Sequence, residues 1–236
     1  MDALRSDLNS DFTWSTNRVA AGGVTQIFLL VEWRGGIQGP SRHKGMKSHQ
    51  IAEHVQLDLQ LEEPIQLTNV YGGILDSRMG QHITVSIGPL SDNGSKQVVL
   101  ELLAGPYRSG IYPVITAGWS YRDRDTLQVT NFPSYTLQLQ FSNHTDLRSR
   151  KPDERVEKAL RLLQNPLILD EAEQLFKQGD LEAGESMLRR RADEMMLCAL
   201  RADDEDYLKE AETLYRLSTL YFGTFSPIDT YKRKIE

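Results

Sequence analysis

Residues 55–61 read VQLDLQL, and this stretch decides the fold because its apolar and polar residues alternate strictly. Two later stretches repeat the alternation, HITVSIG at residues 82–88 and YTLQLQF at residues 135–141. A period of two places successive side chains on opposite faces of a β-strand, with one face buried and the other in water. The residues expected to be buried are Val55, Leu57, Leu59, Leu61, Ile83, Val85, Ile87, Leu137, Leu139 and Phe141.

The surrounding sequence supplies the partners of these strands. Residues 24–33, VTQIFLLVEW, are apolar on both faces, which is typical of a strand covered on both sides. Turn signals recur every 8–12 residues, as in antiparallel sandwiches, and Pro113 indicates an edge or a bulge at the start of its strand. We therefore predict a β-sandwich of about nine strands over residues 1–145, in which residues 12–33 pair with strands that follow residue 51.

The period becomes helical after Asn143, where apolar residues recur every three or four positions. Pro152 and the acidic residues after it are typical of a helix start, and Pro166 is expected to stop or kink this helix. Gly179 and the aspartate after it predict a corner. Residues 146–236 thus form a predicted α-helical hairpin or bundle tail, which makes the fold class α+β.

The arginines at residues 189–191 have acidic residues three or four positions away along the predicted helix. Such spacing is typical of ion pairs on a solvated helix face. We therefore expect these arginines to stabilise the helix through ion pairs rather than to bind a ligand.

Composition excludes several classes of protein. The net charge of −6 provides no general attraction for nucleic acid. No run approaches the roughly 20 apolar residues of a membrane-spanning helix, and the polar, acidic first residues do not fit a signal peptide. Cys198 is the only cysteine and has no partner for an internal disulfide. We expect a cytoplasmic protein.

No motif for an enzyme or a cofactor is present. The sequence contains no Gly-x-Ser-x-Gly, no phosphate-binding loop and no dinucleotide-binding motif. Its histidines lack the cysteines or acidic residues that would complete a tetrahedral metal site. We therefore predict that the protein is not an enzyme and uses neither a cofactor nor a metal.

The glycine-rich, basic segment 35–49 leaves one alternative open. We interpret it as a surface loop that binds no metal. A hydrolase or ligand-binding site would instead be favoured if Arg42, His43 and His49 converged with the charged turn at Asp123.

A second alternative is a carbohydrate-binding sandwich. Aromatic rings stack against sugars when they lie exposed on a flat surface. Trp119 and Tyr121 alternate along one predicted strand, so they would serve if both rings were exposed on one face. The competing interpretation is that both rings belong to the core.

Apolar stripes on the predicted helices are too wide to stay in water, since burying one such side chain gains roughly 1.5–3 kcal/mol. A single hairpin buries only part of this surface. We therefore expect apolar residues of the last helix to bind a protein partner or a second copy of the chain. The predicted partner-binding residues are Tyr215, Leu217, Leu220, Tyr221 and Phe222.

Five segments together resemble the part of bacterial von Willebrand factor type A domain-containing proteins that lies outside the A domain. They are TNRVAAGGVTQIFLLVEW (16–33), IAEHVQLDLQL (51–61), IQLTNVYGG (65–73), HITVSIGPL (82–90) and EAEQLFKQGDLEAGESMLRRR (171–191). The resemblance implies a non-catalytic scaffold or protein-interaction module that carries an A domain.

The A domain itself has no counterpart in this sequence. Its Asp-x-Ser-x-Ser metal motif is absent, and only residues 35–49 stand where the domain would be inserted. The resemblance therefore implies either a natural version without the A domain or an engineered deletion, and no metal chemistry carries over to any residue.

Overall fold

The computed structural model describes residues 9–34, 50–91, 94–123, 127–143 and 151–225; for residues 9, 50, 51, 123 and 221–225 it describes the backbone alone. The chain divides into two compact units, residues 1–160 and 161–236. The first unit holds the β-strands and the second holds most of the three helices.

One sheet of the first unit has four strands in the order β1 (Asn9–Trp14), β3 (Thr25–Arg34), β8 (Ser95–Ala104) and β5 (Gln66–Tyr71). All neighbours in this sheet are antiparallel. β3 pairs with β8 along its whole length, which confirms that the N-terminal strands join those that follow residue 51.

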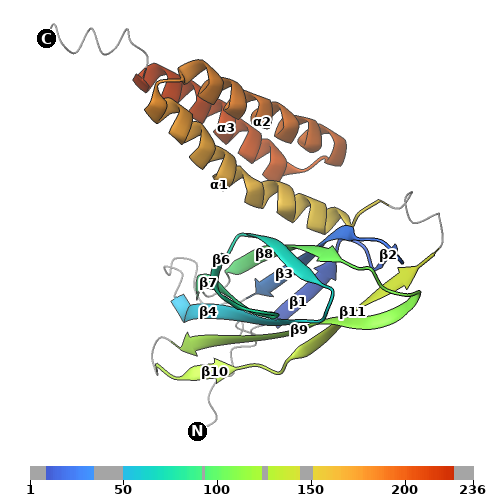
Figure 1. Cartoon of the computed structure of the whole chain (residues 1–236). Coiled ribbons are helices and arrows are strands. Elements are labelled where there is room, and N and C mark those ends of the chain that lie inside the picture. The colour runs from blue at the N-terminus through green and yellow to red at the C-terminus, as the bar shows by residue number, and fades with distance from the viewer. Residues whose placement is uncertain (1–8, 35–49, 92–93, 124–126, 144–150, 226–236) are drawn as a thin grey trace, which may run out of the picture. The chain divides into compact units, whose positions relative to one another are not determined.

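The other sheet has seven strands. Six run in the order β2 (Arg18–Ala20), β11 (Tyr135–Ser142), β9 (Gly110–Asp123), β4 (Gln50–Leu61), β7 (His82–Ser91) and β6 (Ile74–Met79), and β10 (Val129–Asn131) also pairs with β9 (Figure 1). β2 and β11 are parallel, and the other pairs are antiparallel.

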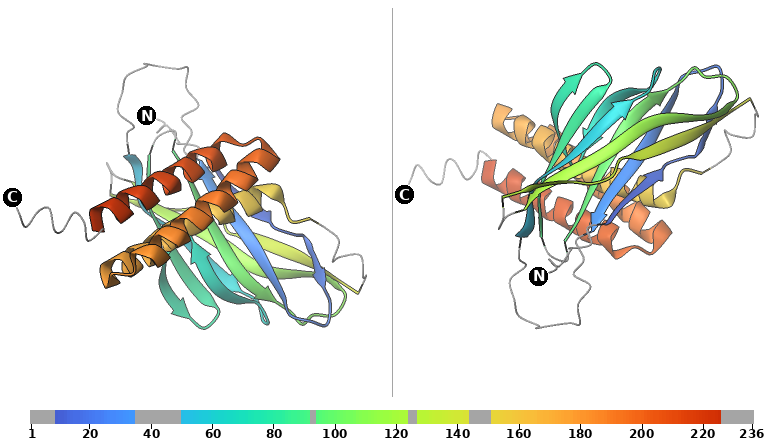
Figure 2. Two further views of the ribbon diagram at one scale, coloured as in Figure 1. Left: turned by 90° about the horizontal axis from the view of Figure 1, so that it is seen from above. Right: turned by 90° about the horizontal axis from the view of Figure 1, so that it is seen from below.

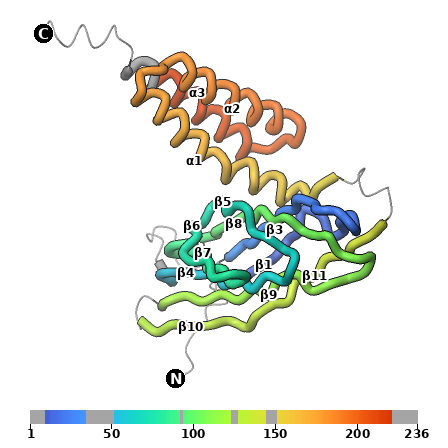
Figure 3. Tube along the Cα trace, viewed as in Figure 1, coloured from blue at the N-terminus to red at the C-terminus, as the bar shows by residue number. Residues whose placement is uncertain are grey.

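The described part of the chain thus has eleven strands rather than about nine. The two strands missing from the prediction are β2, with three residues, and β6, whose residues are almost all exposed. Figure 3 follows the chain from β5 in one sheet to β6 in the other. Neither β2 nor β6 shows an alternation that a sequence pattern could reveal.

Inward-facing side chains of both sheets form one hydrophobic core. The ten residues predicted from the alternation all belong to it, with Leu137 only partly buried. The rings of Trp33 and Trp119, one from each sheet, meet edge to face with centroids 6.4 Å apart. On the opposite face of the four-stranded sheet, Leu30 and Val99 are neighbours in register and are also fully buried, so β3 is covered on both sides as predicted.

The first turns of α1 (Glu154–Gln178) belong to the β-sandwich unit. The Asp153 N–H donates to the Ser15 carbonyl at 2.8 Å, and the Arg155 guanidinium donates to the Glu32 carboxylate of β3. Val156 is buried one residue later. Together these contacts fix the start of the helix on the sandwich. We expected Pro166 to stop or kink α1; the helix continues through it, so a stop does not occur.

The second unit contains the rest of α1 together with α2 (Leu181–Ala202) and α3 (Glu205–Phe225). The predicted corner is present: Gly179 has φ +86°, and the Asp180 side chain accepts the Ala183 N–H at 3.2 Å as the N-cap of α2. α2 and α3 lie side by side (Figure 2). With two sheets and three C-terminal helices, the predicted α+β class is confirmed.

The hydrophobic core of this helical unit contains Ala172, Phe176, Leu188, Ala192, Met195, Ala199, Tyr207, Ala211 and Leu214. Among the described residues, no helix combines the length and the apolar character needed to cross a membrane.

Candidate functional site

An open pocket with a volume of about 280 Å³ lies where β4, β9 and β10 meet. We call it the bulge pocket, and its lining residues are His54, Gln56, Ser120, Tyr121, Arg122 and Val129. Most of these residues are polar, although they lie beside strands whose other face forms the hydrophobic core.

An irregularity of β4 shapes this pocket. Glu53 pairs with Arg122 of β9, and the next aligned pair is Gln56 with Ser120, so β4 carries one residue more than β9 over this interval. Such an extra residue is a β-bulge, which bends a strand and re-aims its side chains. Glu53 and His54 are both accessible between two buried neighbours, whereas a regular strand would turn one of them toward the core.

His54 has the backbone conformation that makes this bulge possible. Its φ is +49°, in the left-handed region that non-glycine residues seldom adopt. A residue held there costs on the order of 1–3 kcal/mol, and such residues cluster at functional sites. The strain therefore draws attention to the pocket that His54 lines.

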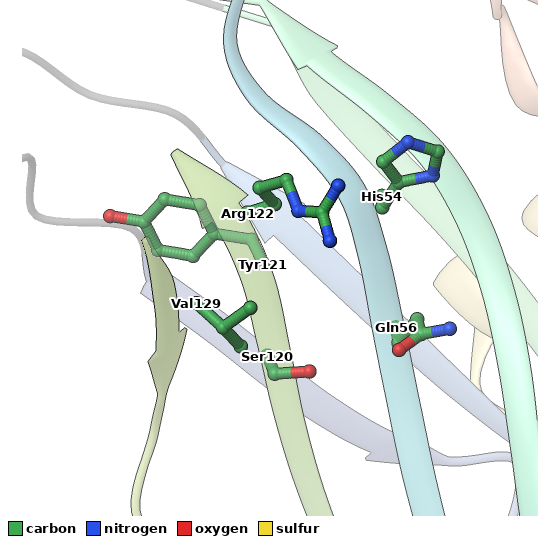
Figure 4. A pocket seen from close by; sticks show the side chains of 6 residues that line it. All are labelled: His54, Gln56, Ser120, Tyr121, Arg122 and Val129. Carbon is green, nitrogen blue, oxygen red and sulfur yellow. The ribbon is translucent and has the colours of Figure 1, made fainter. Parts of the chain in front are cut away.

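The pocket presents hydrogen-bond donors. Figure 4 shows the Arg122 guanidinium and the Ser120 hydroxyl extending from β9 toward β4, which carries His54 and Gln56. None of the lining residues is acidic, and exposed Val129 adds an apolar contact. The set is suited to a ligand that accepts hydrogen bonds rather than to a cation. No group of three or more His, Cys, Asp or Glu side chains in the described part of the chain is placed to hold a metal ion.

The residues of the predicted hydrolase or ligand site cannot be compared with this pocket directly. Arg42, His43 and His49 lie outside the described residues. Asp123 ends β9 next to Arg122, but its side chain is also outside the description. What the structure brings together instead is Arg122 with His54, a pair that the sequence analysis did not single out.

The carbohydrate-binding alternative required both rings to be exposed and is wrong, and the competing interpretation, that both rings belong to the core, is confirmed. Trp119 and Tyr121 are both buried, because they continue the core-facing phase of Ile115 and Ala117 along β9. Phe132 stacks over Trp119 with ring centroids 3.7 Å apart and planes within 3°. The two rings therefore offer no flat exposed face to a sugar.

The predicted partner-binding residues lie on different sides of α3. Tyr215 is half-buried, and its hydroxyl donates to the Asp193 carboxylate of α2, a bond that raises the pKa of Tyr215. Leu217 packs partly against the helical core, whereas Leu220 is exposed. Tyr221 and Phe222 belong to α3, but their side chains lie outside the described residues. A role of these five residues in binding stays a prediction.

A buried polar network fixes the position of α1 against the other two helices within the helical unit. The Arg191 Nε donates to Asn165 Oδ1 at 2.8 Å, and Asn165 Nδ2 donates to Glu210 Oε2 at 3.0 Å. Arg189, two residues before Arg191, makes the expected ion pair with Glu185 at 2.7 Å. The arginines at residues 189–191 are thus only partly solvated, since Arg191 is buried at the contact with α1.

The opposite side of the α2–α3 hairpin exposes leucines that the sequence analysis did not select. Leu200 follows Arg191 by nine residues, about two and a half helical turns, and so faces away from α1. Its side chain is 76% exposed, and Leu208 of α3 is 38% exposed. We call Leu197, Leu200 and Leu208 the hairpin face. The helical period of α2 could have identified the hairpin face, because Leu200 lies on the side of the helix opposite Arg191.

No protein-family model matches the chain, and no curated protein sequence does so either. Solved structures are similar to it in fold. The ArnB paralog VWA2 from Sulfolobus acidocaldarius has a TM-score of 0.53 at 9% identity, and the match covers 91% of this chain and 98% of that one. A von Willebrand factor type A protein from Catenulispora acidiphila has a TM-score of 0.49 at 15% identity, covering 66% of this chain and 38% of that one.

A cohesin module from Clostridium perfringens has a TM-score of 0.41 at 9% identity, covering 58% of this chain and 98% of that one. The similarity to VWA2 is one of fold. It confirms the expected resemblance to von Willebrand factor type A proteins at the level of architecture. The chain spans 38% of the Catenulispora protein, which leaves most of that protein without a counterpart.

Proposed function

We propose that the protein is a non-catalytic interaction or scaffold module that binds a helix of another protein molecule through the hairpin face. The observation that carries this proposal is the exposure of Leu200 and Leu208 on the side of the hairpin opposite α1. Exposed leucines are unremarkable singly, but leucines grouped across two helices are typical of a contact surface.

The register of the hairpin places these leucines together. The Tyr215 hydroxyl binds the Asp193 carboxylate, which aligns α3 with α2 at that level. Leu200 lies seven residues, about two turns, after Asp193, and Leu208 lies two turns before Tyr215. Because the two helices are antiparallel, Leu200 and Leu208 reach the same level on the same side.

A helix is the occupant that fits this surface. α1 already packs on the other side of the same hairpin through Asn165, which bonds to Arg191 and Glu210. An amphipathic helix laid along two others with apolar residues three or four apart is a common mode of recognition. Complete burial of one leucine side chain contributes roughly 1.5–3 kcal/mol. Burial of the two or three leucines of the hairpin face therefore favours association with a partner helix.

We also propose that the chain is the platform of a von Willebrand type A protein without the A domain. The support is the resemblance of the five segments quoted above together with the position of residues 35–49. These residues connect β3 of one sheet with β4 of the other, and connections between elements tolerate inserted domains. The gene sequence that encodes residues 34–50 tests this, because an interrupted A-domain reading frame there would identify a deletion.

Photo-crosslinking tests the proposed contact. A photoreactive residue at position 200 or 208 should give a discrete crosslinked product in cells, whereas the same residue at exposed Ser186 of α2 should not. Light scattering then distinguishes the source, since a second copy would raise the mass above the 26.9 kDa of one chain. The Leu200→Ser and Leu208→Ser double variant should abolish both signals. Equal products at positions 186, 200 and 208, or none, would refute the proposal.

A further inference from the structure

We propose that the bulge pocket binds a carboxylate group, with Arg122 as its principal anchor. The proposal is independent of the hairpin face, because it rests on a different surface in the other unit. The pocket combines a guanidinium, an imidazole, an amide and a hydroxyl in one opening of about 280 Å³.

Arg122 supplies the charge that an anion requires. The guanidinium of Arg122 makes no ion pair within the described part of the chain, whereas Arg155 and Arg34 of the same unit both contact Glu32. Glu53 is aligned with Arg122 across β4 and β9. An exposed guanidinium can therefore offer two parallel N–H groups to the two oxygens of a carboxylate.

Other side chains lie beside the Arg122 guanidinium. The Gln56 amide nitrogen donates to Asp76 Oδ2 at 3.4 Å, and the amide oxygen lies on the side of β9 (Figure 4). The Ser120 hydroxyl extends from β9 toward β4, on the same side as the Arg122 guanidinium (Figure 4). His54 adds a ring N–H. No acidic side chain is among the described residues that line the pocket, and the nearest described carboxylates, Asp76 and Glu53, lie beside it.

The pocket selects a carboxylate attached to a short carbon chain. Val129 of β10 is exposed at the rim and can contact methylene groups. The chain carries a net charge of −6, so general electrostatic attraction does not bring anions to this surface. Binding thus depends on local geometry. The carboxylate can come from an acidic side chain of a partner protein or from a free dicarboxylic acid.

The bulge builds this arrangement. His54 can reach the opening because the extra residue in β4 makes both Glu53 and His54 accessible in succession. The left-handed φ of +49° at His54 is a conformation that glycine adopts without strain. His54→Gly therefore removes the imidazole while preserving the backbone, which separates the contribution of the ring from that of the fold.

Titrations of the intact ¹⁵N-labelled chain test the proposal by NMR. The probes are glutarate, for a free acid, and acetyl-glutamate N-methylamide, for a protein side chain; acetyl-glutamine N-methylamide is the neutral control. We expect saturable shifts of the amide signals at residues 54–56 and 120–122 with one or both acids. Arg122→Gln should weaken binding by about tenfold or more, as expected for a charged hydrogen bond. His54→Gly should weaken it less, and Arg108→Gln, at an exposed arginine elsewhere in the unit, should leave it unchanged.

The results distinguish the two sources and can overturn the proposal. Binding of the blocked glutamate as tightly as glutarate indicates an acidic side chain of a partner, whereas binding of glutarate alone indicates a free acid. The proposal fails if neither acid gives saturable shifts, if the neutral glutamine probe binds equally well, or if Arg122→Gln has no effect. Tighter binding of inorganic phosphate than of both acids would also overturn it, because the site would then favour a different class of anion.

Discussion

Removal of the Arg155 guanidinium should destabilise the β-sandwich unit and leave the helical unit unchanged. Arg155 belongs to the first turn of α1 and donates to the carboxylate of Glu32, whose side chain is only 8% exposed. Gln97 Nε2 donates to the other oxygen of Glu32 at 2.8 Å. The charge of Glu32 raises the pKa of Arg155 above its ordinary value, against the smaller opposing effect of burial.

The size of the effect follows from the geometry of the pair. Arg155→Met leaves the buried Glu32 carboxylate with Gln97 and with Arg34, whose nearest nitrogen is 3.8 Å away. A hydrogen bond to a charged group contributes about 1.5–3 kcal/mol. Because the Arg155 side chain is 52% exposed, water screens part of this interaction. We therefore expect a loss of about 1–2 kcal/mol for Arg155→Met and less than about 0.5 kcal/mol for the control Arg34→Met.

Tryptophan fluorescence measures this loss in the right unit. All three tryptophans, Trp14, Trp33 and Trp119, lie in the β-sandwich unit, so their emission during urea unfolding is a probe of that unit alone. This matters because a chain with two compact units does not have to unfold in a single step. Circular dichroism at 222 nm measures the helices in the same samples.

A double-mutant cycle decides whether the two side chains act as a pair. Combining Glu32→Gln with Arg155→Met should cost less than the two single losses added together, because each variant already removes the same interaction. Additive losses would refute the pairing. Equal urea midpoints for the unfolding of Arg155→Met and Arg34→Met would show that the contact between Arg155 and Glu32 contributes no measurable stability.

Two further predictions concern the helical unit. Gly184→Ala should destabilise this unit by about 1–3 kcal/mol, because a Cβ at residue 184 would lie 2.7 Å from Phe176 Cε1. Urea unfolding followed by circular dichroism measures the loss of stability, and Ser186→Ala, at an exposed position of α2, is the control. Equal losses in the two variants would contradict the steric cause. The hydrogen bond with Asp193 raises the pKa of Tyr215, so its stabilising effect is fully present below about pH 10 and is lost as the pH rises through the folded-state value. Wild type should therefore exceed Tyr215→Phe in urea stability at about pH 8 but lose this advantage at high pH, and a constant advantage would contradict the linkage.

The sequence predicted those strands whose two faces meet different environments. Leu57 and Leu59 are buried while Gln56 and Asp58 lie on the accessible face, so the alternation of β4 is visible in its composition. β6 is exposed on both faces, with Ile74 and its neighbours accessible, and therefore has no period to detect. Periodicity reveals a strand only where burial separates its faces.

Tertiary packing overrode the local signal at Pro166. A proline inside a helix costs roughly 3 kcal/mol, which made an interruption of α1 a sound expectation. The helix nevertheless continues, and it is fixed on both sides of the proline, by Arg155 in one unit and by Phe176 in the core of the other. Contacts with distant parts of the chain are not visible in the local sequence.

The bulge pocket was beyond prediction for a related reason. The imidazole of His54 and the guanidinium of Arg122 come from strands far apart in the chain, and only the register of β4 and β9 brings them to one pocket. A left-handed residue is predicted from glycine or asparagine in a turn, whereas histidine within an alternating stretch gives no such warning. The alternation that places Trp119 on one face of β9 could be read from the sequence. Whether that face is buried depends on the other sheet, which the local sequence does not show.

The strand pairing has a consequence for synthesis on the ribosome. β3 finds its neighbour β8 only when about 70 more residues have been made, which takes roughly 4–14 s at about 5–20 residues per second. β2 waits longer still, since its parallel neighbour β11 ends at Ser142. During this interval the apolar side chains of β3 emerge with only the short β1 available for pairing. A nascent chain of this protein should therefore expose the apolar side chains of β3 until the residues of β8 have left the exit tunnel.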